Sequence, residues 1–172
     1  MVDKTKTKVR ESGADPSVYE IHYKARKDFI QRQNTGKLLV KSIEREFENS
    51  RQGRVKFILY PNVWPENALQ DWAVFMQDIV RHSGKHRHQG SLVIFVLEGR
   101  GYTVVDGVRM DWKKNDLILL PLKPGGVEHQ HFNLQPGEPC TWLAFIHIPT
   151  YDQVASVTEQ LELSPLYSST VK

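Results

Sequence analysis

The protein has 172 residues, of which 40% are hydrophobic and 25% are charged, and its formal net charge at pH 7 is +3. A chain of this length corresponds to about one domain and can bury a core of its own. The small positive charge, with acidic residues mixed among the basic ones, argues against nucleic acid as a partner. The single cysteine, Cys140, excludes an internal disulfide and a zinc site built from several thiolates.

No segment of the sequence suggests export or a membrane. The opening residues, MVDKTKTKVRESG, are polar and basic rather than apolar. The longest apolar runs, such as LVIFVL, are far too short to span a bilayer. We therefore expect a soluble protein of a reducing compartment, the cytoplasm, with no membrane partner.

The N-terminal third predicts a flexible segment followed by a helical arm. Residues 1–15 are polar and rich in lysine, and we expect them to be flexible. Residues 16–54 predict the arm, because Asp15-Pro16 resembles a helix start and apolar residues then recur at helical spacing. These residues form two stripes: Val18, Ile21, Ala25, Phe29 and Ile30, then Leu38, Leu39, Ile43 and Phe47. We expect the arm to pack on the main body or across the interface of a homodimer or higher homo-oligomer.

From residue 55 to residue 150 the pattern is typical of β-structure. Short β-branched and aromatic runs alternate with turns rich in Gly, Pro, Asn and Asp, which predicts an all-β sandwich or barrel. Asp106-Gly107 predicts a tight hairpin, because glycine readily adopts the positive φ that such turns require. Residues 151–172 predict a C-terminal tail, with a short helix over residues 151–163.

Four of the seven histidines occur in two His-x-His pairs, His86 with His88 and His129 with His131. Residues i and i+2 of a strand project to the same face, so each pair predicts two imidazoles side by side. If both strands belong to one barrel, three or four imidazoles converge on its interior. Neutral imidazoles are ligands for Fe(II), Zn(II), Ni(II) and Cu(II). The alternative is that these histidines lie on solvent-facing strands.

The two histidine segments resemble the motifs of the cupin family over roughly residues 55–149. The first family motif is Gly-x5-His-x-His-x3,4-Glu-x6-Gly, and here His86 and His88 are followed by Leu92 and Gly99 at the positions of its last two residues. The second is Gly-x5-Pro-x-Gly-x2-His-x3-Asn, and the segment PGGVEHQHFN, residues 124–133, fits its last part. The resemblance implies a cupin β-barrel, a jelly roll, that holds a metal ion with His86, His88 and His129.

Most metal-binding cupins carry a glutamate ligand where this chain has Leu92. A three-histidine site resembles that of the gentisate, salicylate and hydroquinone ring-cleaving dioxygenases. The resemblance implies Fe(II), with Zn, Ni or Mn as other candidate metals, and a small chelating substrate and O2 as partners. In such a reaction a carbon–carbon bond is cleaved without an external reductant.

Further site residues are predicted around these ligands. The resemblance gives His131 an acid/base or hydrogen-bonding role beside the metal, and its alternative is purely structural. We expect Leu92 to border the metal, because it lies four residues beyond His88 on what we interpret as the same strand face. Arg81 makes the entry basic, which suits an anionic substrate. Tyr60 and Trp142 are candidates for a flat aromatic wall, although aromatic residues in strands are usually core.

Two other functions fit the same motifs. The chain would then be a binding or sensor cupin, or a non-catalytic partner subunit of a two-component dioxygenase. A metal-dependent isomerase or lyase on the same scaffold is the second alternative. Metal content together with oxygen consumption separates these from the dioxygenase.

Overall fold

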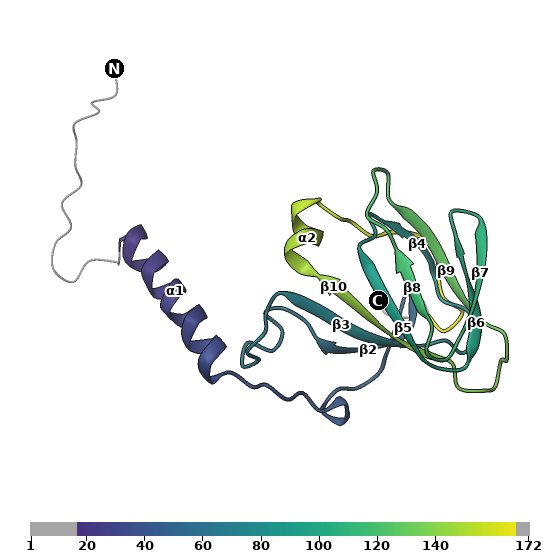
Figure 1. Cartoon of the computed structure of the whole chain (residues 1–172), viewed down its shortest axis with the longest axis horizontal. Coiled ribbons are helices and arrows are strands. Elements are labelled where there is room, and N and C mark those ends of the chain that lie inside the picture. Colours follow the sequence, from purple (N-terminus) through teal and green to yellow (C-terminus); the bar gives the residue numbers. More distant parts are fainter. Residues whose placement is uncertain (1–16, 168–172) are drawn as a thin grey trace, which may run out of the picture.

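The computed structural model describes residues 17–167, so the predicted flexible segment, residues 1–15, lies outside the described residues. Two antiparallel sheets form the body of the molecule (Figure 1). In spatial order the first sheet contains β1 (Glu48–Ser50), β2 (Gly53–Leu59), β3 (Trp72–Asp78), β10 (Thr141–His147), β5 (Leu92–Glu98) and β8 (Leu117–Leu120). The second contains β11 (Glu159–Glu162), β4 (Lys85–His88), β9 (Val127–Asn133), β6 (Arg100–Val105) and β7 (Val108–Lys113).

The core lies between the two sheets and follows the two-residue period of the strands. In β5, Leu92, Ile94 and Val96 are buried, whereas Val93 between them is exposed. The three buried residues of β5 pack in one cluster with residues of both sheets, including Trp142 of β10. The predicted all-β fold is confirmed as a two-sheet sandwich with an N-terminal helix.

The Asp106-Gly107 hairpin is confirmed where it was predicted, between β6 and β7. Both residues have positive φ, 47° and 82°, as a two-residue turn between twisted strands requires. A Cβ on Gly107 would meet no atom within 4 Å, so only the backbone conformation favours glycine here.

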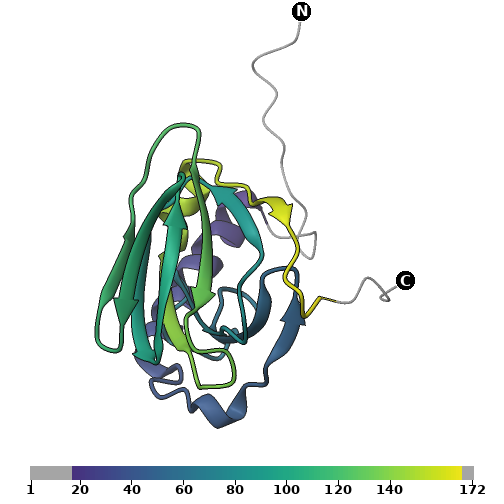
Figure 2. The ribbon, with the colours of Figure 1, turned by 90° about the vertical axis from the view of Figure 1, so that its right-hand side faces the viewer.

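The N-terminal helix, α1 (Val18–Thr35), stands apart from the sheets in Figure 1 and lies behind them in the view of Figure 2. It buries none of its residues. Ser17 caps it by accepting a hydrogen bond from the Glu20 backbone N–H at 3.2 Å. The second predicted stripe, residues 38–47, does not continue the helix; it is extended apart from one 3-10 turn (Ser42–Glu44). The backbone of Lys37 bonds to Glu66 and Ala68 instead, which holds the chain in an extended bridge.

Among residues 17–167, no helix is long and apolar enough to cross a membrane.

The C-terminal segment differs from the predicted helix. Helix α2 (Ile148–Gln153) ends well before residue 163, and β11 follows it. Strand β11 pairs with β4, which places Glu159 opposite Arg87 and Gln160 opposite His86. Because β4 would otherwise be an unpaired edge, the strand satisfies backbone groups that a helix would leave open. The sheet therefore extends beyond residue 150.

The outward face of the first sheet carries apolar side chains in register. They are Val74 and Met76 of β3, Leu143 and Phe145 of β10, Val93 and Phe95 of β5, and Leu117 and Leu119 of β8. Leu117 and Leu119 are 59% and 63% exposed, and contiguous exposed apolar surface often marks a protein–protein interface.

We predict a homodimer that buries this face together with the exposed arm. Light scattering is expected to give about twice the 19.9 kDa mass of one chain. A double substitution, Leu117→Lys with Leu119→Lys, is expected to yield monomers, because it places two charges in the interface. A wild-type mass near one chain at micromolar concentration would contradict the prediction.

Candidate metal centre

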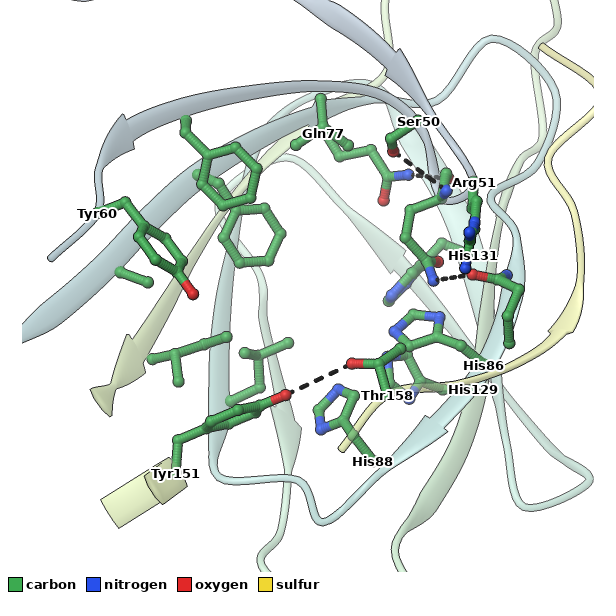
Figure 3. Close-up of a pocket in the computed structure, with 18 of the residues that line it drawn as sticks. Ser50, Arg51, Tyr60, Gln77, His86, His88, His129, His131, Tyr151 and Thr158 are labelled. Atoms are coloured by element: carbon green, nitrogen blue, oxygen red, sulfur yellow. Dashed lines mark hydrogen bonds between the residues drawn. The ribbon is translucent and has the colours of Figure 1, made fainter. Parts of the chain in front are cut away.

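The four histidines of the two pairs lie on adjacent strands of the second sheet. Strand β4 carries His86 and His88, β9 carries His129 and His131, and His86 is directly opposite His129 in the antiparallel register. Figure 3 shows them on one wall of a cavity. The ring centroids of His86 and His129 are 4.1 Å apart, and those of His88 and His129 are 4.9 Å apart. One potential ligand nitrogen from each of His86, His88 and His129 lies within 4.8 Å of the others.

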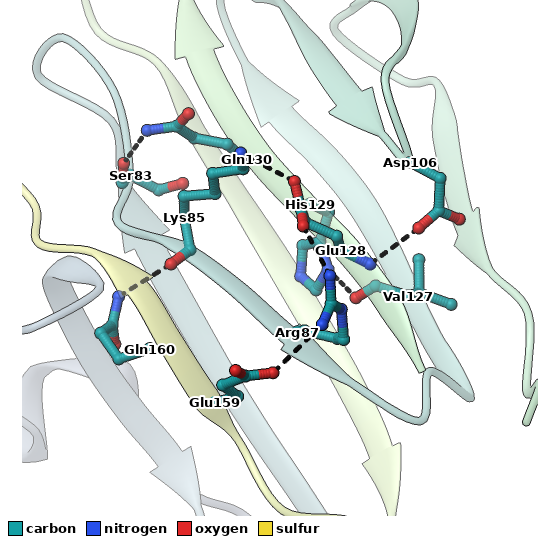
Figure 4. Close-up of polar contacts among 10 residues, drawn as sticks. All are labelled: Ser83, Lys85, Arg87, Asp106, Val127, Glu128, His129, Gln130, Glu159 and Gln160. Atoms are coloured by element: carbon teal, nitrogen blue, oxygen red, sulfur yellow. Dashed lines mark hydrogen bonds and ion pairs between the residues drawn. The ribbon is translucent and has the colours of Figure 1, made fainter. Parts of the chain in front are cut away.

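An ion-pair network on the outer face of the sheet orients β4. Glu128 of β9 accepts from Lys85 at 2.7 Å and from Arg87 at 2.9 Å, and Arg87 also reaches Glu159 of β11 at 3.3 Å (Figure 4). These pairs are partly exposed, so solvent screening leaves them little effect on stability. Their importance is geometric. With Lys85 and Arg87 on the outside, the alternation of the strand turns His86 and His88 inward.

The surroundings keep the clustered imidazoles neutral. Burial, followed by the neighbouring His88, lowers the pKa of His86 to about 4. Burial also lowers the pKa of His88, and it lowers the pKa of His129 well below its usual range. A neutral imidazole has one nitrogen lone pair free, which is the form that binds a metal ion.

In His86 and His129, a hydrogen bond to a backbone carbonyl determines which ring nitrogen has the free lone pair. The Nδ1 of His86 lies 3.4 Å from the Gly84 carbonyl oxygen, and the Nδ1 of His129 lies 3.2 Å from that of Val127. Since a carbonyl only accepts, Nδ1 carries the hydrogen in both rings and Nε2 keeps its lone pair. The Nε2 of His129 is buried and has no hydrogen-bond partner among the described residues. A buried nitrogen with a free lone pair is suited to bind a metal cation.

His88 is held differently. Its Nδ1 accepts a hydrogen bond from the Gly90 N–H at 3.0 Å, so the neutral ring has its hydrogen on Nε2. To bind a metal ion through Nε2, this ring has to leave the Gly90 bond. Metal–imidazole bonds of about 2.0–2.1 Å allow ligand nitrogens to be up to roughly 4 Å apart, close to the spacing in the cluster. With that adjustment, and with the ring nitrogens drawn slightly closer together, the three histidines fit a divalent ion.

No carboxylate joins the three histidines anywhere in residues 17–167. Glu128, the nearest acidic residue in sequence, points to the outer face and pairs with Lys85 and Arg87. The family's glutamate position is occupied by Leu92, which is buried and lines the cavity. The donor set is therefore three imidazoles alone.

The histidines open onto a cavity of about 430 Å³, a size that suits a small organic molecule. Its apolar wall includes Val55, Phe57, Phe75, Leu92, Trp142 and Ile146. Its polar lining includes Arg51, Gln52, Tyr60, Gln77, Tyr151 and Gln160. Of the predicted substrate-binding residues, Tyr60, Leu92 and Trp142 thus line the cavity.

Arg81, predicted to bind the substrate, is not among the residues that line this cavity. Its backbone carbonyl accepts from the Asn133 N–H at 2.8 Å, and its side chain is exposed. Arg51, on the turn between β1 and β2, is the arginine that lines the cavity. Nothing around Arg51 in the sequence distinguishes it, because the pairing of β1 and β2 brings it to the site.

Leu92 reaches the cavity by a route other than the one we expected. Gly90 and Ser91 both have positive φ, 90° and 62°, and they turn the chain from β4 in the second sheet to β5 in the first. A Cβ on Gly90 would lie 2.0 Å from the Pro121 carbonyl oxygen, so only glycine fits at this corner. Leu92 therefore belongs to the opposite sheet from His88 and not to the same strand face.

Residues 79–146 match the family model of the cupin domain. The matched region contains both histidine pairs, half of the strands of the first sheet and all of the second sheet except β11. The chain contains a cupin domain. This cupin resembles a gentisate 1,2-dioxygenase from Ralstonia sp, to which it is 38% identical over 65 residues. That alignment covers 37% of this chain but only 17% of the relative.

Two solved structures show the same fold. A variant of salicylate 1,2-dioxygenase from Pseudoaminobacter salicylatoxidans, in complex with gentisate, matches 89% of this chain and 40% of its own with a TM-score of 0.52 and 22% identity. The nucleoside dehydratase Pac13 from Streptomyces matches 74% of this cupin and 94% of its own chain, with a TM-score of 0.52 and 14% identity. One scaffold thus carries different reactions, and the site has to indicate the chemistry.

Proposed function

We propose that this cupin is a metal-dependent dioxygenase, with Fe(II), that cleaves a carbon–carbon bond of an aromatic or other chelating substrate. The observation that carries the proposal is a three-histidine cluster without a carboxylate, facing a cavity for a small molecule. The 38% identity over 65 residues to a gentisate 1,2-dioxygenase supports the same reaction class.

The ion would be held by His86, His88 and His129 and would supply coordination positions for two substrate oxygens and for dioxygen. The protein supplies the orientation. Phe75 and Trp142, whose ring centroids are 5.9 Å apart, offer an apolar wall against which a flat substrate stacks and from which water is excluded.

On the polar side, we propose that Arg51 and Tyr60 orient the substituents of the substrate. Both line the cavity. A guanidinium group donates to a carboxylate or phenolate, so Arg51 favours an anionic substrate.

Metal content and oxygen consumption test the proposal. The metal-free protein, reconstituted anaerobically with Fe(II), is expected to bind about one ion per chain. With gentisate, salicylate or hydroquinone in turn, it should consume one O2 per substrate molecule, whereas the Zn(II)-loaded protein should consume none. Metal binding without oxygen uptake on any of these compounds would favour the binding cupin, the partner subunit or the isomerase. Failure to bind metal would contradict the assignment of the three histidines as a metal site.

A further inference from the structure

His131 is the one member of the two pairs outside the three-histidine cluster, and it is buried beside it. Its ring centroid is 5.4 Å from that of His129 and 5.0 Å from that of Trp142. Its Nδ1 lies 2.8 Å from the Thr103 hydroxyl, and the same hydroxyl lies 2.8 Å from the indole Nε1 of Trp112. Thr103 and His131 are 0% and 1% exposed, so water does not compete for these bonds.

Trp112, Thr103 and His131 thus form a chain of hydrogen bonds, which we call the relay. The positions of its hydrogens can be assigned from elementary chemistry. An indole N–H only donates, so the Thr103 oxygen accepts from Trp112. The hydroxyl has one hydrogen, and the Nδ1 of His131 is the only other partner of this oxygen in the described structure. Nδ1 of His131 is therefore the acceptor. The neutral ring then carries its hydrogen on Nε2.

This arrangement is opposite to that of His129, two residues earlier on the same face. The Val127 carbonyl leaves His129 with a lone pair on Nε2, whereas the Thr103 hydroxyl leaves His131 with an N–H there. The Nε2 of His131 is buried and has no hydrogen-bond partner among residues 17–167, although the residue lines the cavity. A buried N–H without an acceptor is unfavourable, so this group requires an acceptor that the described residues do not supply.

We propose that Thr103 and Trp112 are positioning residues, which set His131 as a hydrogen-bond donor to an oxygen atom of the bound substrate. This inference rests on the proposed function, and it makes the substrate class more specific. The group that meets His131 is an acceptor, such as a phenolate, carboxylate or carbonyl oxygen. A hydroxyl that has to lose its proton to His131 does not fit, because Nε2 has no lone pair to receive it.

Thr103→Val tests the relay, because valine has nearly the same shape as threonine and lacks the hydroxyl. The matched control is Thr103→Ser, which keeps it. In metal-free protein, nitrogen-15 NMR of the imidazoles is expected to show the Nε2–H tautomer of His131 as the main form in wild type and Thr103→Ser. In Thr103→Val, this tautomer should no longer be the main form. Trp112→Phe, which removes the indole donor, should have the same effect and serves as the second variant if Thr103→Val does not fold.

A binding measurement connects the relay to the substrate. In anaerobic titration of the Fe(II) protein with gentisate, Thr103→Val is expected to bind roughly tenfold more weakly with unchanged metal content, the loss expected of one hydrogen bond to a charged group. Thr103→Ser should restore the affinity, and His131→Ala should match Thr103→Val or exceed it. The inference is overturned if NMR shows an Nδ1–H ring in the wild type, or if Thr103→Val binds gentisate like the wild type. The NMR result does not depend on turnover, so it separates failure of the relay from failure of the proposed function.

Discussion

The His129→Ala variant is expected to lose metal binding by a factor of about 100 or more, and with it all oxygen uptake. His129 is 1% exposed, its ring is the neighbour of both other candidate ligands, and its Nε2 is the buried nitrogen that lacks a partner. Alanine removes one of three donors and leaves His86 and His88 as a pair, which binds a divalent ion far more weakly. Elemental analysis after anaerobic reconstitution with Fe(II), and calorimetric titration with Zn(II), measure the loss.

The control for this variant is His22→Ala. His22 lies on the exposed helix α1, far along the chain from the cluster, and its removal is expected to leave metal content and turnover unchanged. The site assignment would be wrong if His129→Ala, folded as judged by circular dichroism, still held about one ion per chain. Equal metal loss in both variants would point instead to adventitious binding by surface histidines.

Leu92→Glu is expected to keep the metal, or bind it more tightly, while losing the dioxygenase activity that we propose for this site. Leu92 is 4% exposed, lines the cavity of the histidine cluster and occupies the position at which the cupin motif has a carboxylate ligand. A glutamate there adds an oxygen donor and takes up space that a chelating substrate needs. The cation also compensates the buried negative charge, which would otherwise be costly. Metal content, anaerobic gentisate titration and oxygen-uptake rates are measured on the same preparation.

Leu92→Gln separates the charge from the change in size. It has nearly the shape of glutamate but is a weaker ligand, so it should bind metal no more tightly than the wild type. Leu92→Met keeps the apolar wall, and most of the turnover should survive. Normal turnover by Leu92→Glu would contradict the model of a chelating substrate and would favour the binding protein or the isomerase.

Much of this site follows from local spacing. The residues of each His-x-His pair, His86 with His88 and His129 with His131, face the same side because a strand repeats every two residues, whatever it packs against. The same reasoning places Arg87 on the outer face, where it pairs with Glu128. The hairpin at Asp106-Gly107 is also local, because it depends on the backbone freedom of two adjacent residues.

Other features depend on which distant segments pair, and no periodicity reveals this. The sequence predicts a helix over residues 151–163, yet β11 completes the edge of β4 and brings Gln160 into the cavity lining. Arg51 and not Arg81 lines the cavity, because the turn between β1 and β2 projects there. Pairings across such separations are set by backbone hydrogen bonding and burial over the whole sheet.

The sequence by itself determined an all-β fold in which two histidine pairs present neighbouring imidazoles, since side chains alternate every two residues along a single strand. Only the tertiary structure decided what each imidazole is able to do. The Nδ1 of His129 is paired with the backbone carbonyl of Val127 on its own strand. The Nδ1 of His131 is paired with the hydroxyl of Thr103 on another strand. A carbonyl accepts and this hydroxyl donates, and that single difference leaves a lone pair on one ring and an N–H on the other.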